Sequence, residues 1–243
     1  MPNKTVPFEV PPIRIGRVKM RLIGDEILCV HNWSDKAKRL MLEKQMGKAQ
    51  QGKEPKCPTE DFLGALHVMP GCKPLLHDED PGSIYAVGEF GFRACGLKAA
   101  IIRAATDVGM RMTDMRRAIR IPGSILKENC FGSEALIRLH CDPGPYMRCD
   151  MVRLESGVAD LRFRPEFRNW SADVLIRFNR AVITLEQVVN LVRTAGFGVG
   201  LCEWRPERGG EWGTFKVDSH IETLPDEFEE TFLPTISAQE NRP

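Results

Sequence analysis

The stretch that decides the fold spans residues 172–217 and reads ADVLIRFNRAVITLEQVVNLVRTAGFGVGLCEWRPERGGEWGTFKV. Residues 172–183 alternate apolar and polar side chains, which predicts a half-buried strand. Thr184 followed by Gln187 has the spacing of a capping box, so a helix is expected to begin there. The helix is expected to end at the first glycine, and residues 197–217 are expected to return as a glycine-rich β segment.

Strand, helix, glycine-rich turn and strand make up the second half of a ferredoxin-like unit, the core that RRM-like proteins share. The first half is expected from a strand at 13–23, a helix at 97–108 and strands between 135 and 163. We therefore predict an α+β fold with an RRM/ferredoxin-like core over residues 1–217. A large basic insertion at about 31–90 is expected to interrupt it.

The charge of the chain is uneven along its length. Its 243 residues carry 34 Lys and Arg against 33 Asp and Glu, a net charge of +1. Residues 218–243 carry −6, so the first 217 residues carry +7. A basic body with an acidic C-terminal tail is compatible with nucleic-acid binding, although many solvated tails have the same composition. No apolar run is long enough to span a bilayer and the N-terminus has no secretory signal, so we expect a cytoplasmic protein with no membrane partner.

The residues that usually carry catalysis or bind metals form no familiar motif. The eight cysteines include no C-x-x-C pair, and no Walker, nucleophile-elbow or Rossmann fingerprint is present. We therefore expect reduced thiols, no cofactor and no catalytic residue. The histidines lie far apart in the sequence, at His31, His67, His77, His140 and His220. The one cluster that could be weighed as a zinc site has ligand spacing unlike the common modules; it comprises Cys57, His67, Cys72 and His77.

The glycine-rich segment combines three features that suit single-stranded nucleic acid. Glycines allow close backbone approach, arginines bind phosphate, and tryptophans offer faces on which bases stack. The alternative is a glycine-rich hairpin whose tryptophans cap the core. The residues concerned are Gly198, Gly200, Trp204, Arg205, Arg208 and Trp212.

Two further basic surfaces are candidates for the same ligand. A helix with an N-cap at Ser34 would carry several lysines and arginines, and residues 34–56 have a net charge of +4. Alternating arginines near residue 162 would share one face of a strand, where RRM-like sheets stack bases. The alternatives are a solvated helix face, and pairing of the strand arginines with Asp160 and Glu166. The candidate residues are Lys36, Lys38, Arg39, Lys44, Arg162, Arg164 and Arg168.

The glycine-rich segment resembles the C-terminal glycine-rich loop of the RAMP superfamily, the RRM-like proteins of CRISPR effector complexes. The chain as a whole is also similar to a group of bacteriophage proteins. Cys202 departs from the RAMP pattern, because another glycine is more usual there. The RAMP match rests on Val199-Gly200-Leu201, Arg205 to Arg208 and Gly213-Thr214-Phe215, and the phage match on residues 34–38 and 203–207.

These resemblances imply a non-catalytic protein that binds single-stranded RNA or DNA. RAMP backbone subunits coat a strand in several copies, so a homo-oligomer or filament is expected, in the host cytoplasm if the protein is phage-encoded. Its task would be phage recombination or replication, or CRISPR interference. Two alternatives remain: a metal-independent RAMP-type endoribonuclease, and a protein-only structural assembly module.

Overall fold

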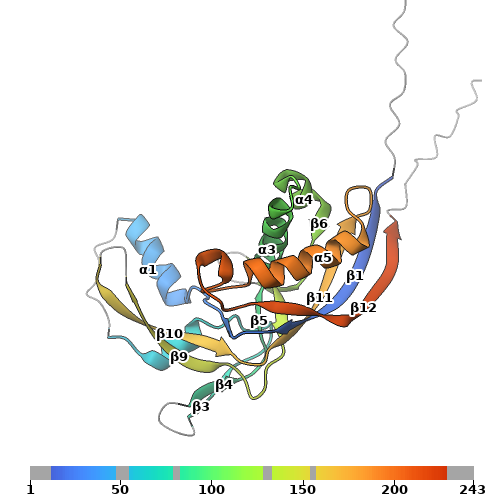
Figure 1. Ribbon diagram of the computed structural model, residues 1–243. Coiled ribbons are helices and arrows are strands. Elements are labelled where there is room, and N and C mark those ends of the chain that lie inside the picture. The colour runs from blue at the N-terminus through green and yellow to red at the C-terminus, as the bar shows by residue number, and fades with distance from the viewer. Residues whose placement is uncertain (1–11, 48–54, 79–82, 128–132, 154–156, 229–243) are drawn as a thin grey trace, which may run out of the picture.

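Figure 1 shows the computed structural model, which describes residues 12–47, 55–78, 83–127, 133–153 and 157–228. The chain combines α-helices with several antiparallel sheets, so the α+β class predicted from the sequence is confirmed. Within these ranges no helix has both the length and the apolar character needed to cross a membrane.

One antiparallel sheet joins strands from the two ends of the described chain. Its strand order is β12-β1-β11-β6, formed by β1 (Arg14–Gly24), β6 (Ile119–Arg120), β11 (Ser171–Asn179) and β12 (Phe215–Phe228). Side chains alternate between the two faces of a strand, so every second residue enters the core. Val18, Ile176 and Phe178 are accordingly at most 1% exposed.

Two helices cover one face of this sheet (Figure 1): α3 (Ala94–Asp107) and α5 (Leu185–Thr194). α3 lies between β1 and β6 in the sequence, and α5 lies between β11 and β12. The capping box predicted for α5 is confirmed, because Gln187 N donates to Thr184 Oγ1 at 3.2 Å and Thr184 N donates to Gln187 Oε1 at 3.0 Å. The helix expected at 97–108 is present as α3 and begins slightly earlier, and the short α4 (Met112–Ala118) follows it.

The remaining strands form two further sheets beside this core. The larger has the order β2-β10-β9-β4-β3 and the smaller β5-β8-β7. Their bounds are β2 (Leu28–Cys29), β3 (Leu75–Asp78), β4 (Ile84–Val87), β5 (Phe90–Arg93), β7 (Ser124–Lys127), β8 (Ser133–Leu139), β9 (Tyr146–Arg153) and β10 (Ala159–Phe167). The expected insertion at 31–90 therefore contributes β3 and β4 to the larger sheet. It also contains two helices, α1 (Asp35–Gln45) and α2 (Pro58–Gly64).

The strands expected at 135–163 do not complete the four-stranded sheet. β9 and β10 pair with each other from Tyr146 to Glu166, in the larger of the other sheets. β9 and β10 are consecutive strands, so their pairing closes only a short loop and costs little chain entropy. In the four-stranded sheet, β11 pairs instead with the two-residue β6, and its Ser171 forms an isolated β-bridge with His140.

The boundary predicted at Val217 for an acidic tail is wrong. The strand β12 continues to residue 228 and pairs along the whole of β1. Its carboxylates face the basic side chains of that strand: Glu222 lies 3.6 Å from Lys19 and Glu227 lies 3.1 Å from Arg17. The acidic composition of residues 218–228 thus reflects cross-strand pairing. Residues 229–243, the remainder of the expected tail, lie outside the described residues.

Candidate nucleic-acid interface

The glycine-rich segment (residues 195–214) leaves α5 through a single π-helical turn, η1 (Ala195–Val199). It does not form the β segment expected from the sequence; the next strand begins only at Phe215. Gly200 has a φ of +72°, and a Cβ there would lie 2.7 Å from Pro206 Cδ. Its small size therefore lets the segment fold back on itself, and its part in admitting a bound strand stays a prediction. Gly198, by contrast, has open space around it.

The two tryptophans of the segment have different environments. Trp204, at φ +52°, is 53% exposed. Trp212 packs against it with ring centroids 5.7 Å apart, and the Arg148 guanidinium covers the Trp212 ring at 4.3 Å. Trp212 N also donates to Trp204 O at 3.0 Å, which closes the loop. Trp204 therefore presents an aromatic ring to solvent, while Trp212 supports it.

The two arginines of the segment also differ. Arg205 donates to Glu207 Oε2 at 2.7 Å and to Cys202 O at 2.9 Å, so it holds the shape of the loop, including the short 3-10 turn η2 (Pro206–Arg208). Arg208 is exposed, and its side chain has no hydrogen bond or ion pair with any other residue that the structure describes. Of the two, Arg208 is the cation that a ligand can reach without breaking an existing contact.

Phe197 is an exposed aromatic residue that the sequence reasoning missed. It is 86% exposed, the highest value among the large hydrophobic residues described as exposed. Its position between Gly196 and Gly198 was the available signal, because an aromatic side chain flanked by glycines has few neighbours to cover it. Phe197 and Trp204 thus place two aromatic faces on one short segment.

A cavity of about 380 Å³ opens between the glycine-rich segment and the N-terminus of α3. We call it the α3 cavity. Its polar wall includes two histidines from outside both elements, and burial lowers the pKa of His31. Burial also raises the pKa of Cys202 to about 12, so this thiol stays protonated and is no nucleophile at neutral pH. The charged and polar lining residues are His31, His67, Arg93, Cys95, Cys202, Glu203, Arg205, Glu207 and Arg208.

His67 is the most enclosed of these residues, at 4% exposure. Burial, with smaller contributions from Arg93, Lys38 and His31, lowers its pKa to about 4, so it is neutral at pH 7. Its Nδ1 has no hydrogen-bond partner and lies 4.0 Å from Glu134 Oε2, which also lacks one. The sequence placed His31 and His67 far apart, whereas the fold brings both to one cavity.

The strand arginines do not form the exposed face expected from their alternation. Arg164 is 2% exposed and donates to Asp150 at 2.9 Å and Glu203 at 3.2 Å. Arg162 has its side chain 38% exposed, near Asp160 at 4.0 Å. Arg162 and Arg168 therefore lie beside Asp160 and Glu166, as in the alternative, whereas Arg164 is buried and pairs with Asp150 and Glu203 instead. Two apolar rings confirm that this region is packed: Trp170 and Phe167 are each 1% exposed.

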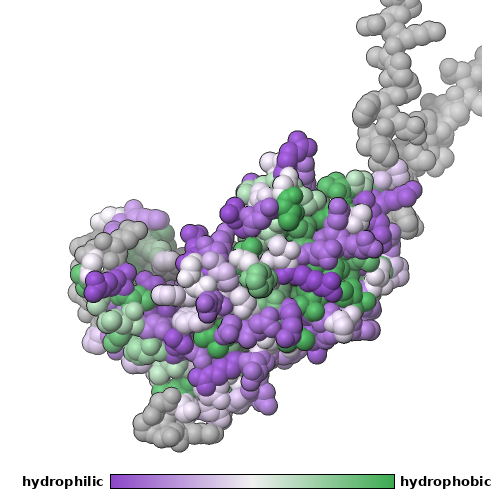
Figure 2. Space-filling model, viewed as in Figure 1, coloured by the Kyte–Doolittle hydropathy of each residue, from purple (hydrophilic) through white to green (hydrophobic). Residues whose placement is uncertain are grey.

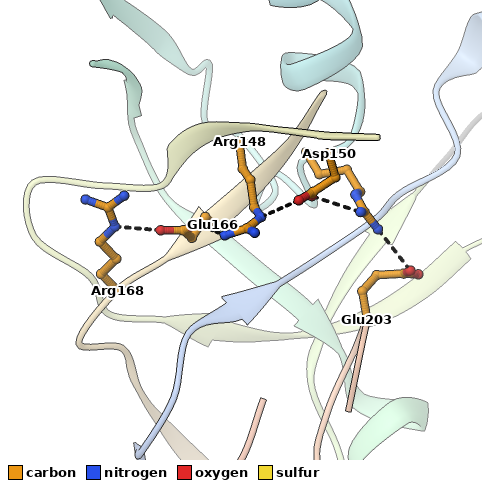
Figure 3. Close-up of polar contacts among 6 residues, drawn as sticks. Arg148, Asp150, Glu166, Arg168 and Glu203 are labelled. Atoms are coloured by element: carbon orange, nitrogen blue, oxygen red, sulfur yellow. Dashed lines mark hydrogen bonds and ion pairs between the residues drawn. The ribbon is translucent and has the colours of Figure 1, made fainter. Parts of the chain in front are cut away.

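A chain of alternating charges runs across β9 and β10 and includes these contacts (Figure 3). Arg148 donates to Asp150 at 2.7 Å and to Glu166 at 2.8 Å, and Arg168 donates to Glu166 at 2.6 Å. Burial raises the pKa of Glu166, but the hydrogen bonds from Arg148 and Arg168 outweigh it and leave the pKa below its usual range. Arg168 keeps a half-exposed side chain over the Tyr146 ring at 4.5 Å. The network contacts the glycine-rich segment through the Arg164–Glu203 ion pair and through the Arg148 guanidinium on the Trp212 ring.

The basic helix predicted after Ser34 is α1, and Ser34 Oγ accepts from Ala37 N at 3.2 Å as an N-cap. No residue of α1 is buried. Its apolar side chains are exposed as well, Leu40 by 56% and Met41 by 42%. Figure 2 shows hydrophilic and hydrophobic residues interspersed over the face that carries α1 and the glycine-rich segment. The basic residues Lys36, Lys38, Arg39 and Lys44 all belong to this helix.

The four residues weighed as a zinc site lie apart. Cys57 contacts Thr59, Cys72 accepts from Glu89 N, and His77 stacks on Tyr85, while His67 lines the α3 cavity. Among the described residues, no group of three or more His, Cys, Asp or Glu side chains is placed to hold a metal ion. Comparison of the sequence with protein-family models and with curated proteins gave no match.

Proposed function

We propose that this protein binds single-stranded nucleic acid on the surface formed by Phe197, Trp204 and Arg208 and by the adjoining α3 cavity. The observation that carries the proposal is that one short segment holds two exposed aromatic rings and an arginine with no partner among the described residues. Bases stack on such rings without regard to sequence, and arginine binds the phosphates between them. A surface of this kind suits RNA or DNA and needs no catalytic group.

The arrangement of the sheet supports a ferredoxin-like core of the RAMP type. The strand order β12-β1-β11-β6, with α3 and α5 as the two crossover helices, is the order 4-1-3-2 of such a unit. The resemblance of the glycine-rich segment to the RAMP loop agrees with this arrangement. Assembly along a strand in several copies, in phage recombination, replication or CRISPR interference, is the part of the proposal that rests on the resemblance alone.

The open face of the four-stranded sheet is a poorer candidate for base stacking than the loop. Its outward side chains are engaged in ion pairs across the strands, such as Arg21 with Asp173 at 2.8 Å and Lys19 with Glu222 at 3.6 Å. RRM sheets use aromatic residues on this face. We therefore place the bases on the glycine-rich segment.

The test is affinity for labelled single-stranded RNA and DNA, measured by fluorescence anisotropy. Stacking contributes roughly 1–3 kcal/mol per base, so Phe197→Ala with Trp204→Ala should weaken binding about tenfold or more. Leu75→Ala, which removes another exposed apolar side chain at 64% exposure, is the matched control and should bind normally. Unchanged affinity in the double variant would contradict the proposed surface.

We propose that the basic residues of helix α1 extend the nucleic-acid-binding surface. If its basic residues follow the phosphate backbone, affinity should fall steeply with salt through release of counterions. Charge reversal at Lys36 and Lys44 should weaken binding to all sequences alike, with the melting temperature unchanged. Lys38 is left unchanged in this variant, because its side chain is only 17% exposed and lies 3.9 Å from Asp35. Salt-independent affinity would limit the surface to the glycine-rich segment.

Two observations favour the alternative functions. The convergence of His31 and His67 on the α3 cavity favours a metal-independent endoribonuclease. Cleavage of labelled RNA in the presence of EDTA, lost in His67→Ala, would establish it. The exposed apolar residues of α1 favour a protein-only assembly module. A purified protein with a nucleic-acid-free absorbance spectrum and no affinity for either strand type would favour that module.

A further inference from the structure

A row of three arginines crosses the four-stranded sheet. Arg17 on β1 is directly opposite Arg177 on β11, and Arg177 is directly opposite Arg120 on β6. The neighbouring residues Val18 and Phe178 are buried in the core, so the alternation of a strand places the arginines on the other face of the sheet. Residues directly opposite in an antiparallel pair have Cβ atoms about 4.5–5.5 Å apart, and like charges in such positions destabilise a sheet. The row therefore needs compensating negative charge.

The negative charge that the fold supplies does not reach the β6 end of this row. Glu227 forms ion pairs with both Arg17 and Arg177. Arg120 is exposed, and its side chain has no hydrogen bond or ion pair with any other residue that the structure describes. A further cation lies nearby, because burial and, to a smaller extent, the charge of Arg120 lower the pKa of Lys98. Arg120 thus has two cations near it and no carboxylate partner in the described chain.

A hollow of about 370 Å³ lies at this end of the row. We call it the β6 hollow. Arg117 from α4, Arg120 and Arg177 line it, and its described lining contains no Asp or Glu. Arg117 is exposed and, like Arg120, its side chain has no hydrogen bond or ion pair within the part of the chain that the structure describes. The β6 hollow shares no lining residue with the α3 cavity, so it is a separate site of positive charge.

The chemistry of the β6 hollow favours a phosphate group. Arginine binds phosphate through parallel charged hydrogen bonds. The tetrahedral oxygens of a phosphate can accept from two separate arginines, whereas the two oxygens of a carboxylate lie in one plane. Ile13 and Ile15 form an apolar part of the wall, and the volume is near the lower end of the roughly 300–1,000 Å³ of small-molecule sites. The hollow therefore suits one phosphate group with a small organic part attached.

We propose that the β6 hollow binds a phosphate group, which accepts hydrogen bonds from Arg117 and Arg120 and offsets the repulsion within the arginine row. The phosphate belongs either to a small ester or to the backbone of a nucleic-acid strand. The second case rests on the proposed function and gives the strand a contact outside the glycine-rich segment. Neither case uses Phe197, Trp204 or Arg208, so different variants test the two proposals.

The first experiment follows the melting temperature of the full chain as sodium phosphate replaces sodium chloride at constant ionic strength. A ligand that binds only the folded state raises the melting temperature in a saturable manner, and phosphate should do so in the parent protein. Sodium acetate, the carboxylate probe, should bind at least about tenfold more weakly because it makes fewer charged hydrogen bonds. The general stabilising effect of phosphate on proteins is shared by every variant and is removed by comparison with them.

The double variant Arg117→Gln with Arg120→Gln assigns the binding to this hollow. Its affinity for phosphate should fall at least about tenfold, because the charged hydrogen bonds are lost. Arg193→Gln, at an exposed arginine on α5, is the matched control and should respond as the parent does. In chloride alone the double variant should melt no lower than the parent, because it removes like charges. A large loss of stability there would show that the two arginines hold the fold and would overturn the inference.

The second experiment identifies the source of the phosphate, with labelled single-stranded RNA and DNA in chloride buffer. If the source is a strand, the double variant should bind it more weakly, and the slope of log affinity against log salt should become shallower by about 0.7 for a lost phosphate contact. Unchanged affinity for the strand, together with a lost response to phosphate, identifies the small ester.

The two proposals fail in different ways. A parent protein that binds no strand refutes the proposed function, whereas its response to phosphate still tests the β6 hollow. The inference is overturned if phosphate gives no saturable rise in the parent, if acetate acts equally well, or if the double variant responds to phosphate as the parent does.

Discussion

Replacing Arg164 by methionine tests whether the buried arginine supports the fold or binds nucleic acid. The side chain is 2% exposed and makes charged hydrogen bonds to Asp150 at 2.9 Å and to Glu203 at 3.2 Å. Breaking a buried ion pair by removing one partner costs about 3–5 kcal/mol. Asp150 keeps a hydrogen bond from Arg148 and the Glu203 side chain is 37% exposed, so both carboxylates retain some stabilisation. We therefore expect a loss near the lower bound, about 3 kcal/mol.

The assay is urea denaturation followed by circular dichroism. A loss of about 3 kcal/mol is a large part of the roughly 5–15 kcal/mol by which a domain is stable, so the midpoint should fall clearly. Arg162→Met is the matched control: its side chain is 38% exposed and lies 4.0 Å from Asp160, and its loss should cost no more than about 1 kcal/mol. An Arg164→Met protein that unfolds like the parent, yet loses nucleic-acid affinity, would refute the structural role and restore Arg164 as a binding residue.

Three further perturbations test the fold around the site. The pKa of His67 is lowered from 6.5 to about 4, so the unfolded chain takes up a proton at a higher pH than the folded chain does. The free energy of unfolding should therefore decrease by about 3 kcal/mol as the pH falls from 6.5 to 4. Unfolding measured against pH should show this loss in the parent protein and not in His67→Gln. Gly200→Ala should destabilise the protein by about 1–3 kcal/mol because of its positive φ and close neighbours, whereas Gly198→Ala should leave the melting temperature unchanged; equal effects would contradict the observed packing. Truncation after Val217 should prevent folding because it removes most of β12, which pairs along β1; a circular dichroism spectrum like that of the full chain would contradict this role of the strand.

The elements that could be predicted are those whose signals are local. The capping box of α5 needs only Thr184 and Gln187, three residues apart, and both of its hydrogen bonds are present. The strand expected at 13–23 is present as β1, and its pleat sends alternate side chains such as Val18 into the core. Ser34 was likewise recognisable as an N-cap. Each cap forms between residues three apart in the sequence, and the alternation of β1 is a property of that strand alone.

The apolar pattern of α1 shows the limit of such reasoning. An apolar stripe predicts a buried face only if another element is there to cover it. Leu40 and Met41 are exposed because α1 packs none of its residues into the core. The segment 218–228 shows the same limit for charge, since its carboxylates looked like those of a solvated tail and instead pair with β1.

The sequence by itself determined the α+β class, the caps and the glycine-rich segment with its aromatic and basic residues. Only the tertiary structure decided which of those residues a ligand can reach. Arg164 is buried and pairs with Asp150 and Glu203, which lie 14 and 39 residues away in the sequence. His31 and His67 line one cavity although they come from separate parts of the chain. Whether a side chain is buried or paired depends on which strands lie next to one another, and that arrangement is determined by packing over the whole chain.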